Sequence, residues 1–149
     1  MDLKKKLYQK CLDFVNARID NIQQANAYAS ESANDETKSS AGDKHETGRA
    51  MAQLEQEKNS KQLGEALELK RQLDKINPEQ HSEKITAGSL VLTNKGNFYI
   101  AISAGKLLVD ETTCYAVSPA SPIAVGLLGL KKGREYNFNG VKYMIVDVL

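Results

Sequence analysis

The sequence predicts an α+β protein, with an N-terminal antiparallel α-helical coiled-coil hairpin followed by a small antiparallel sheet domain with one helix. Of the ten glycines only three precede residue 81, and all three prolines lie at residue 78 or later. The first half therefore favours helix, and the second half favours strands and turns. Apolar residues also recur at helical spacing before residue 78, whereas short strand-like runs follow it.

The first helix carries apolar or small residues at alternating spacings of three and four, with Asn26 at one intervening position. This spacing is typical of a coiled-coil stripe, which must bury one face against a partner. The residues of the stripe are Leu12, Val15, Ile19, Ile22, Ala29 and Ala33.

The second helix, roughly residues 44–76, supplies a matching stripe. Pairing Ala29 with Met51, Val15 with Ala66 and Leu12 with Leu69 keeps an antiparallel register nearly constant. The middle of the second stripe, residues 58–62, is polar. We expect a hairpin over residues 1–78, in which the apolar positions of the second helix are Met51, Leu54, Leu63, Ala66, Leu69, Leu73 and Ile76.

The turn of the hairpin lies within residues 34–42, where Asn, Asp, Thr, Ser and Gly accumulate. An acidic tip is expected near residues 35–46. Asp43 and Glu46 are three residues apart at a helix start, so both carboxylates share one face and suit a hard cation such as Mg²⁺. Two carboxylates bind Mg²⁺ weakly, so such a site needs ligands from a partner. Spacing alone favours a plainer alternative, in which the acids complement the helix dipole.

Residues 79–84 form a polar linker, and residues 85–149 form the second domain. Strands are expected over residues 89–93, 97–103, 106–109 and 113–117. A helix should follow, with Ser121 as its N-cap, Pro122 at its first position and Gly129 near its end. The sequence Asn139-Gly140 between residues 136–138 and 141–148 predicts a hairpin with a type I′ turn.

Composition and charge exclude several classes of protein. The chain has 20 basic and 19 acidic residues, so a basic surface for direct DNA binding is not expected. No run of 18 apolar residues occurs, which predicts a cytoplasmic protein without a membrane span. Cys11 and Cys114 lack metal or redox spacing and are expected to be buried thiols, and His45 and His81 are weak candidates for chemistry. No catalytic motif is present, so the chain itself is not expected to be an enzyme.

The chain resembles a known family, and two short segments carry the most specific part of the resemblance. Residues 121–133 contain Ser121-Pro122, then Leu-Leu-Gly and Lys-Lys-Gly, which are similar to the C-terminal signature of the Gre transcript cleavage factors of bacteria. Residues 42–46, Gly-Asp-Lys-His-Glu, are similar to that family's Gly-Asp-Leu-x-Glu tip. The resemblance covers nearly the whole chain. It implies an N-terminal coiled coil and an FKBP-like C-terminal domain that docks on RNA polymerase, with Ser121 and Pro122 as candidate contact residues.

The resemblance also implies a function. The hairpin would enter the secondary channel of bacterial RNA polymerase, meet the nascent RNA 3′ end and promote cleavage of backtracked RNA. Asp43 and Glu46 would be donated as auxiliary ligands to a second Mg²⁺ shared with the polymerase, with no tightly bound cofactor. Lys44 and residues 47–50 depart from the family pattern. A non-cleaving channel regulator and a coiled-coil adaptor or chaperone-like module therefore stay open, whereas few aromatic residues disfavour a peptidyl-prolyl isomerase.

Overall fold

The computed structural model describes the backbone of residues 2–38 and 42–149, and the side chains of residues 2–28 and 48–149. The chain forms two compact units. Val15–Lys70 make one unit, and Met1–Phe14 with Arg71–Leu149 make the other. Helices α1 (Leu3–Lys38) and α2 (Gly42–Asp74) each contribute to both units. The sequence predicted three consecutive segments, namely residues 1–78, 79–84 and 85–149. The compact units are not consecutive in this way, because residues 1–14 and 71–78 of the hairpin segment belong to the same unit as the sheet.

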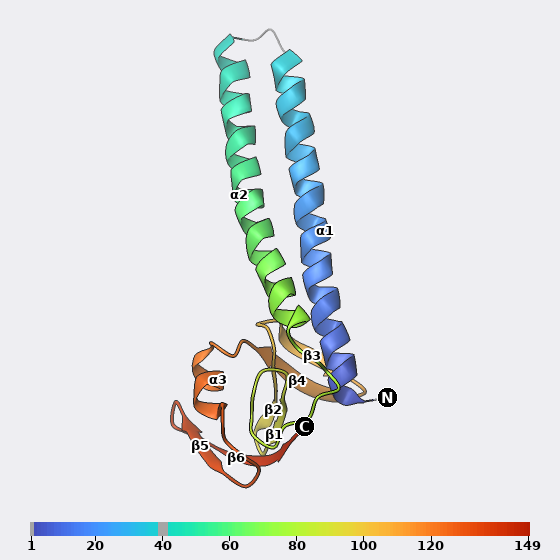
Figure 1. The fold of residues 1–149 in the computed structure, drawn as a ribbon. Helices are drawn as coiled ribbons and strands as arrows, with labels where there is room; N and C mark the ends of the chain where they lie inside the picture. Colours follow the sequence, from blue (N-terminus) through green and yellow to red (C-terminus); the bar gives the residue numbers. More distant parts are fainter. Residues whose placement is uncertain (1, 39–41) are drawn as a thin grey trace. The chain divides into compact units, whose positions relative to one another are not determined.

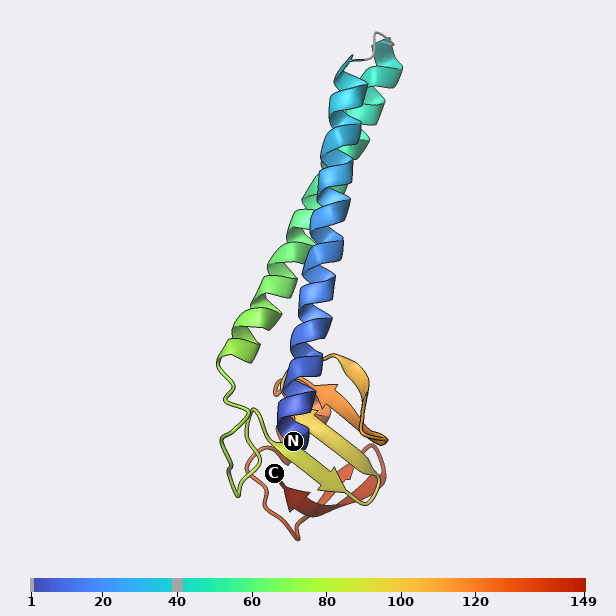
Figure 2. The ribbon, with the colours of Figure 1, turned by 90° about the vertical axis from the view of Figure 1, so that its right-hand side faces the viewer.

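Within the first unit, α1 and α2 run antiparallel and pack against each other (Figures 1 and 2). The buried face of α1 carries Val15, Ile19 and Ile22, and that of α2 carries Ala66. Arg18 and Glu65 form an ion pair between the two helices, with 3.7 Å between their nearest nitrogen and oxygen. The predicted helical hairpin is therefore confirmed.

The predicted stripe of α2 is wrong in its first half. Met51 and Leu54 are 66% and 65% exposed, whereas Asn59 is only 4% exposed. Asn59 lies one heptad before Ala66, so both residues occupy the same side of α2, which is the buried side. Met51 and Leu54 do not lie on this side. The side chain of Ala29, the expected partner of Met51, lies outside the described residues.

The second unit holds one sheet of six strands, in the order β3-β4-β2-β1-β6-β5. The strands pair antiparallel except β2 and β4, which are parallel, so the expectation of a fully antiparallel sheet is wrong at this pair. The chain crosses over after β2, and the β3–β4 hairpin then returns with β4 beside β2 (Figure 1). The strands are β1 (Leu90–Thr93), β2 (Gly96–Ile100), β3 (Gly105–Val109), β4 (Thr112–Val117), β5 (Glu135–Phe138) and β6 (Val141–Val148).

Two of the hairpin turns between these strands have left-handed backbone conformations. Asn139 and Gly140 have φ values of 50° and 77°, which agrees with the predicted type I′ turn. Asp110 and Glu111 adopt the same left-handed conformation, with φ values of 48° and 66°. Asp is tolerated in such a turn, but Glu111 takes the place where glycine is usual, so the residue pair is a weak signal for a type I′ turn.

Each face of the sheet buries side chains. Helix α3 (Pro122–Leu127) belongs to the core on one face, which includes Val91, Phe98, Ile100, Ala124, Leu127 and Ile145. Leu90 and Tyr99 alternate with these strand residues, so they face the other side, and both are fully buried. The first turns of α1 are held to this unit because Tyr8 Oη donates a 2.9 Å hydrogen bond to the Leu73 carbonyl.

Candidate functional site

The acidic tip is the first candidate site. The backbone of Asp43 and Glu46 belongs to the first turns of α2, but their side chains and that of His45 lie outside the described residues. The proposed Mg²⁺ ligation therefore stays a prediction. Among the side chains that are described, no group of three His, Cys, Asp or Glu residues is placed to hold a metal ion. His81 is exposed in the linker.

The start of α3 is the second candidate site. Ser121 has the extended conformation of an N-cap, but its side chain makes no hydrogen bond to the helix. Its Oγ instead donates a 2.6 Å hydrogen bond to the Ser118 carbonyl, and its backbone N–H donates to the same oxygen at 3.0 Å. Pro122 follows at the first helical position and is exposed. Ser121 thus fixes the turn, while Pro122 is free to contact a partner.

The solvent side of α3 is apolar. Pro122, Val125 and Leu128 recur at spacings of three, and Val125 and Leu128 are 59% and 37% exposed. We call these three residues the α3 patch. Pro122 and Val125 are three apart on α3 and lie on one side of it, and Leu128 is the C-cap residue that directly follows the helix. All three present apolar groups to solvent. Such a surface suits a partner that buries apolar side chains, and it offers no group for acid, base or nucleophilic chemistry.

A shallow groove of about 260 Å³ adjoins the loop that precedes α3. Its walls come from the end of α2, from residues near β1 and β2, and from that loop. These segments are far apart in the chain, so no local sequence pattern predicts the groove. Its apolar lining suits a partner side chain. The residues are Gln72, Lys75, Ile76, Ala87, Ala101, Ser118, Pro119 and Ala120.

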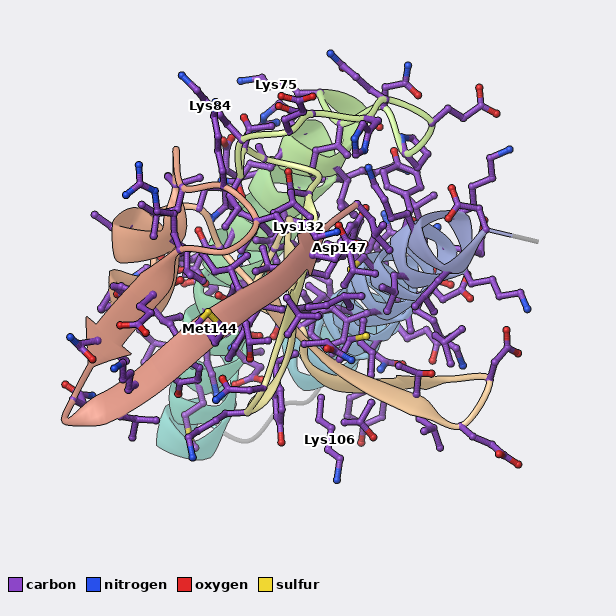
Figure 3. All side chains as sticks on the ribbon, turned by 90° about the horizontal axis from the view of Figure 1, so that it is seen from below. Lys75, Lys84, Lys106, Lys132, Met144 and Asp147 are labelled. Carbon is purple, nitrogen blue, oxygen red and sulfur yellow. The ribbon has the colours of Figure 1, made fainter. Side chains whose placement is uncertain are left out.

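A second groove of about 450 Å³ lies between the linker and the end of β6. Its charged lining residues include Lys131, Lys132, Glu83 and Asp147. Figure 3 shows Lys132 beside Asp147 on the face seen from below. Because both basic and acidic groups line this groove, it selects no single sign of charge.

Charged groups fix the linker to the first turns of α1. Lys5 pairs with Glu79 at 2.9 Å, and this hydrogen-bonded pair raises the pKa of Lys5 and lowers that of Glu79. Lys4 is 5% exposed and donates a 2.7 Å hydrogen bond to the Gln80 carbonyl. Burial lowers the pKa of Lys4, with Asp2 opposing the change. These contacts are structural, since none lies beside a group with reactive chemistry.

The two cysteines are buried thiols, as predicted. Burial raises the pKa of Cys11 to about 12. Burial also raises the pKa of Cys114, and a hydrogen bond with Asn97 opposes this change. A thiol with a raised pKa is a poor nucleophile and metal ligand, because both roles need the thiolate. Tyr99 is fully buried as well, and burial raises its pKa. Its hydroxyl has no hydrogen-bond partner among the residues that the structure describes.

Aromatic rings gather on the α3 face of the sheet and pack on one another. Phe98 and Tyr143 meet edge to face with centroids 5.8 Å apart, and Tyr143 stacks on Tyr136 at 6.3 Å. Tyr136 also reaches Gly126 of α3, where a side chain would overlap its ring. These rings fill the space between α3 and the sheet, so they contribute to packing rather than to an open aromatic pocket.

Among residues 2–38 and 42–149, no helix has a stretch that is both long enough and apolar enough to cross a bilayer. Comparison of the sequence with protein-family models and with curated proteins found no match.

Proposed function

We propose that this chain is a Gre-like transcription elongation factor that binds bacterial RNA polymerase through its secondary channel and promotes cleavage of backtracked RNA. The observation that best supports the proposal is the order of the fold elements. Helices of 36 and 33 residues pack as an antiparallel hairpin, and an α+β sheet unit with one short helix follows. This is the layout that the sequence resemblance implies, and the Ser121-Pro122 motif lies at the start of α3.

The chemical role of the chain is to supply carboxylate oxygens. The backbone of Asp43 and Glu46 is helical, and the two residues are three apart, a spacing at which two positions share one side of a helix. Carboxylate oxygens fit Mg²⁺, and the remaining ligands would come from the polymerase and the RNA phosphate. When bound, the ion would polarise the attacking water and stabilise charge on the phosphate. The polymerase remains the enzyme.

The α3 patch is the proposed anchor. Pro122, Val125 and Leu128 form an exposed apolar surface that would be buried against a helical element of the polymerase. Exposed apolar residues of this kind gain stability when they leave water, by about 25 cal/mol for each Å² that is buried. We expect Val125→Ser to weaken polymerase binding, whereas Val146→Ser, at a β6 residue 51% exposed, serves as the matched control.

RNA cleavage in halted, backtracked elongation complexes with Mg²⁺ tests the proposal. Wild-type protein should accelerate cleavage. Asp43→Asn and Glu46→Gln should each reduce the factor of acceleration at least about tenfold, since each loses a charged metal ligand. Glu55→Gln, at an exposed position of α2, should act like wild type. Equal stimulation by all four proteins would refute the role of the two carboxylates.

The same experiment decides on the non-cleaving alternative, which the residues Thr47-Gly48-Arg49-Ala50 favour because they depart from the family pattern. A protein that binds the polymerase without accelerating cleavage would be a channel-binding regulator.

A different observation favours the adaptor alternative. Tyr28, Met51 and Leu54 are 74%, 66% and 65% exposed, and apolar side chains on a helical hairpin suit the capture of another protein. Failure of purified polymerase to bind would favour that alternative.

A further inference from the structure

Strand β3 is a free edge of the sheet. It pairs with β4 and is the first strand in the order β3-β4-β2-β1-β6-β5. The two-residue type I′ turn at residues 110–111 makes Val109 and Thr112 a hydrogen-bonded pair. Hydrogen-bonded and non-hydrogen-bonded pairs alternate along an antiparallel ladder, so the backbone groups of Leu107 and Gly105 are also hydrogen-bonded to β4.

The backbone groups of the two intervening residues therefore point the other way. The N–H and C=O of Lys106 and Leu108 are directed to the open side of β3, where the described chain provides no further strand. Leu108 is 60% exposed, and Lys106 extends from β3 into solvent (Figure 3). A short edge strand with such groups is a template for another strand.

A groove of about 500 Å³ runs beside this edge. Its opposite wall is a polar stripe of α1 in which residues recur at spacings of three and four. This stripe belongs to the same compact unit as β3. The groove is therefore bordered by a strand edge on one side and by helical side chains on the other. Its lining residues are Lys5, Lys6, Gln9, Lys10, Asp13, Leu108, Val109 and Asp110.

The helical wall is positively charged. Lys6 is paired with Asp110, and Lys5 is paired with Glu79, which lies outside the groove lining. Lys10 forms no ion pair with any side chain that the structure describes. Asp13 accepts a hydrogen bond from Gln9 at 2.9 Å. An acidic occupant would satisfy Lys10 and would share Lys5 and Lys6.

We propose that β3 binds an extended peptide segment of a partner protein, in which acidic and apolar side chains alternate, as an added strand. Side chains of an added strand alternate between the two faces, as those of β3 do. One set would face the lysines of α1, and the other would lie beside Leu108. Backbone hydrogen bonds to Lys106 and Leu108 would provide affinity, and the alternating side chains would provide selectivity.

The same charges argue against a second copy of the chain as the occupant. Two β3 edges that paired with each other would bring together two walls of Lys5, Lys6 and Lys10. Like charges across a contact repel, whereas glutamate or aspartate side chains complement the wall. The proposal rests on the sheet unit alone and does not depend on the proposed function.

The test uses full-length protein and a fluorescent hexapeptide of alternating Glu and Val, with a Lys and Val hexapeptide as the control. Anisotropy titration should show saturable binding of the acidic peptide only. Leu108→Pro removes one outward N–H at an edge position that tolerates proline, and it should weaken binding at least about tenfold. Leu108→Ala keeps that N–H and isolates the contribution of the side chain.

Two further variants test the charge. Lys10→Gln should weaken binding about two- to fivefold, as expected for an exposed ion pair, whereas Lys95→Gln in the β1–β2 turn should have no effect. Lys10→Gln also keeps the test decisive if Leu108→Pro does not fold. Absence of saturable binding, or unchanged binding by both Leu108→Pro and Lys10→Gln, overturns the proposal. Self-association that Leu108→Pro abolishes, without peptide binding, would assign the edge to a second copy and overturn it too.

Discussion

Gly126 provides a sharp test of how α3 packs on the sheet. A methyl group at this position would overlap three atoms of Tyr136, namely Oη, Cζ and Cε1. Tyr136 cannot move freely, because its ring stacks on Tyr143 and on Phe138 at centroid distances of 6.3 and 6.1 Å. Forcing extra volume into such packing costs about 1–3 kcal/mol, whereas replacing a helical glycine by alanine gains up to about 1 kcal/mol. We expect Gly126→Ala to lower the free energy of unfolding by about 1 kcal/mol.

The sign of this effect should reverse when the ring is absent. In a Tyr136→Ala background, Gly126→Ala should stabilise the protein, because only the gain in helix propensity remains. Urea unfolding of the four proteins of this cycle measures the coupling energy, expected at about 1–3 kcal/mol. Gly64→Ala in α2 is the matched control, since a methyl group there meets, beyond its chain neighbours and the nearby backbone of its own helix, no described atom within 4 Å. Destabilisation by Gly126→Ala that is equal in both backgrounds would refute the steric argument.

Three more predictions concern burial. The raised pKa of Cys11 means that the folded state holds its proton more tightly than the unfolded state, so stability is complete below pH 9 and is lost as the pH rises towards 12. Urea unfolding should show a loss between pH 8 and pH 10 that is about 1.4 kcal/mol smaller in Cys11→Ala than in wild type. Asn59→Leu should raise the thermal midpoint, because Nδ2 of Asn59 is buried and has no hydrogen-bond partner within the described part of the chain. A lower midpoint would show that this group is hydrogen-bonded. Leu73→Ala should cost about 2–5 kcal/mol in urea unfolding and Leu54→Ala less than about 0.5 kcal/mol, since Leu73 is fully buried and Leu54 is 65% exposed; equal costs would contradict these burial values.

Local signals in the sequence predicted most of the elements. Asn139-Gly140 specifies a type I′ turn through backbone conformations that few other residues tolerate, and Pro122 suits the first position of a helix. Strand positions followed from short apolar runs between turn residues. The second strand was predicted to reach Ser103 but ends at Ile100, because the chain leaves the sheet there to cross over to β3.

Long-range arrangements were less accessible. The buried side of α2 includes Asn59, whereas Met51 and Leu54 are exposed, so hydrophobicity alone selected the wrong face over this stretch. The parallel pairing of β2 and β4 depends on where the β3–β4 hairpin inserts, which no local residue pattern encodes. That hairpin closes through Asp110 and Glu111, which lack the usual glycine or asparagine.

The candidate sites divide in the same way. Asp43, Glu46, Ser121 and Pro122 came from short motifs, and the structure describes side chains for the last two of these only. The groove beside β3 had no sequence signal, because its walls come from residues 5–13 and 108–110. A cavity whose sides lie about a hundred residues apart becomes visible only once the fold brings them together.

The two proposals use different ends of the sheet unit and can be separated by experiment. The α3 patch belongs to a helix that packs near β5, through Gly126 and Tyr136, whereas the groove borders β3. These strands are the opposite edges of one six-stranded sheet. Leu108→Pro should therefore leave binding through the α3 patch intact, and Val125→Ser should leave peptide binding at β3 intact. If Leu108→Pro also weakened binding to the polymerase, the partner segment at β3 would belong to the polymerase itself, and the two surfaces would act in one complex.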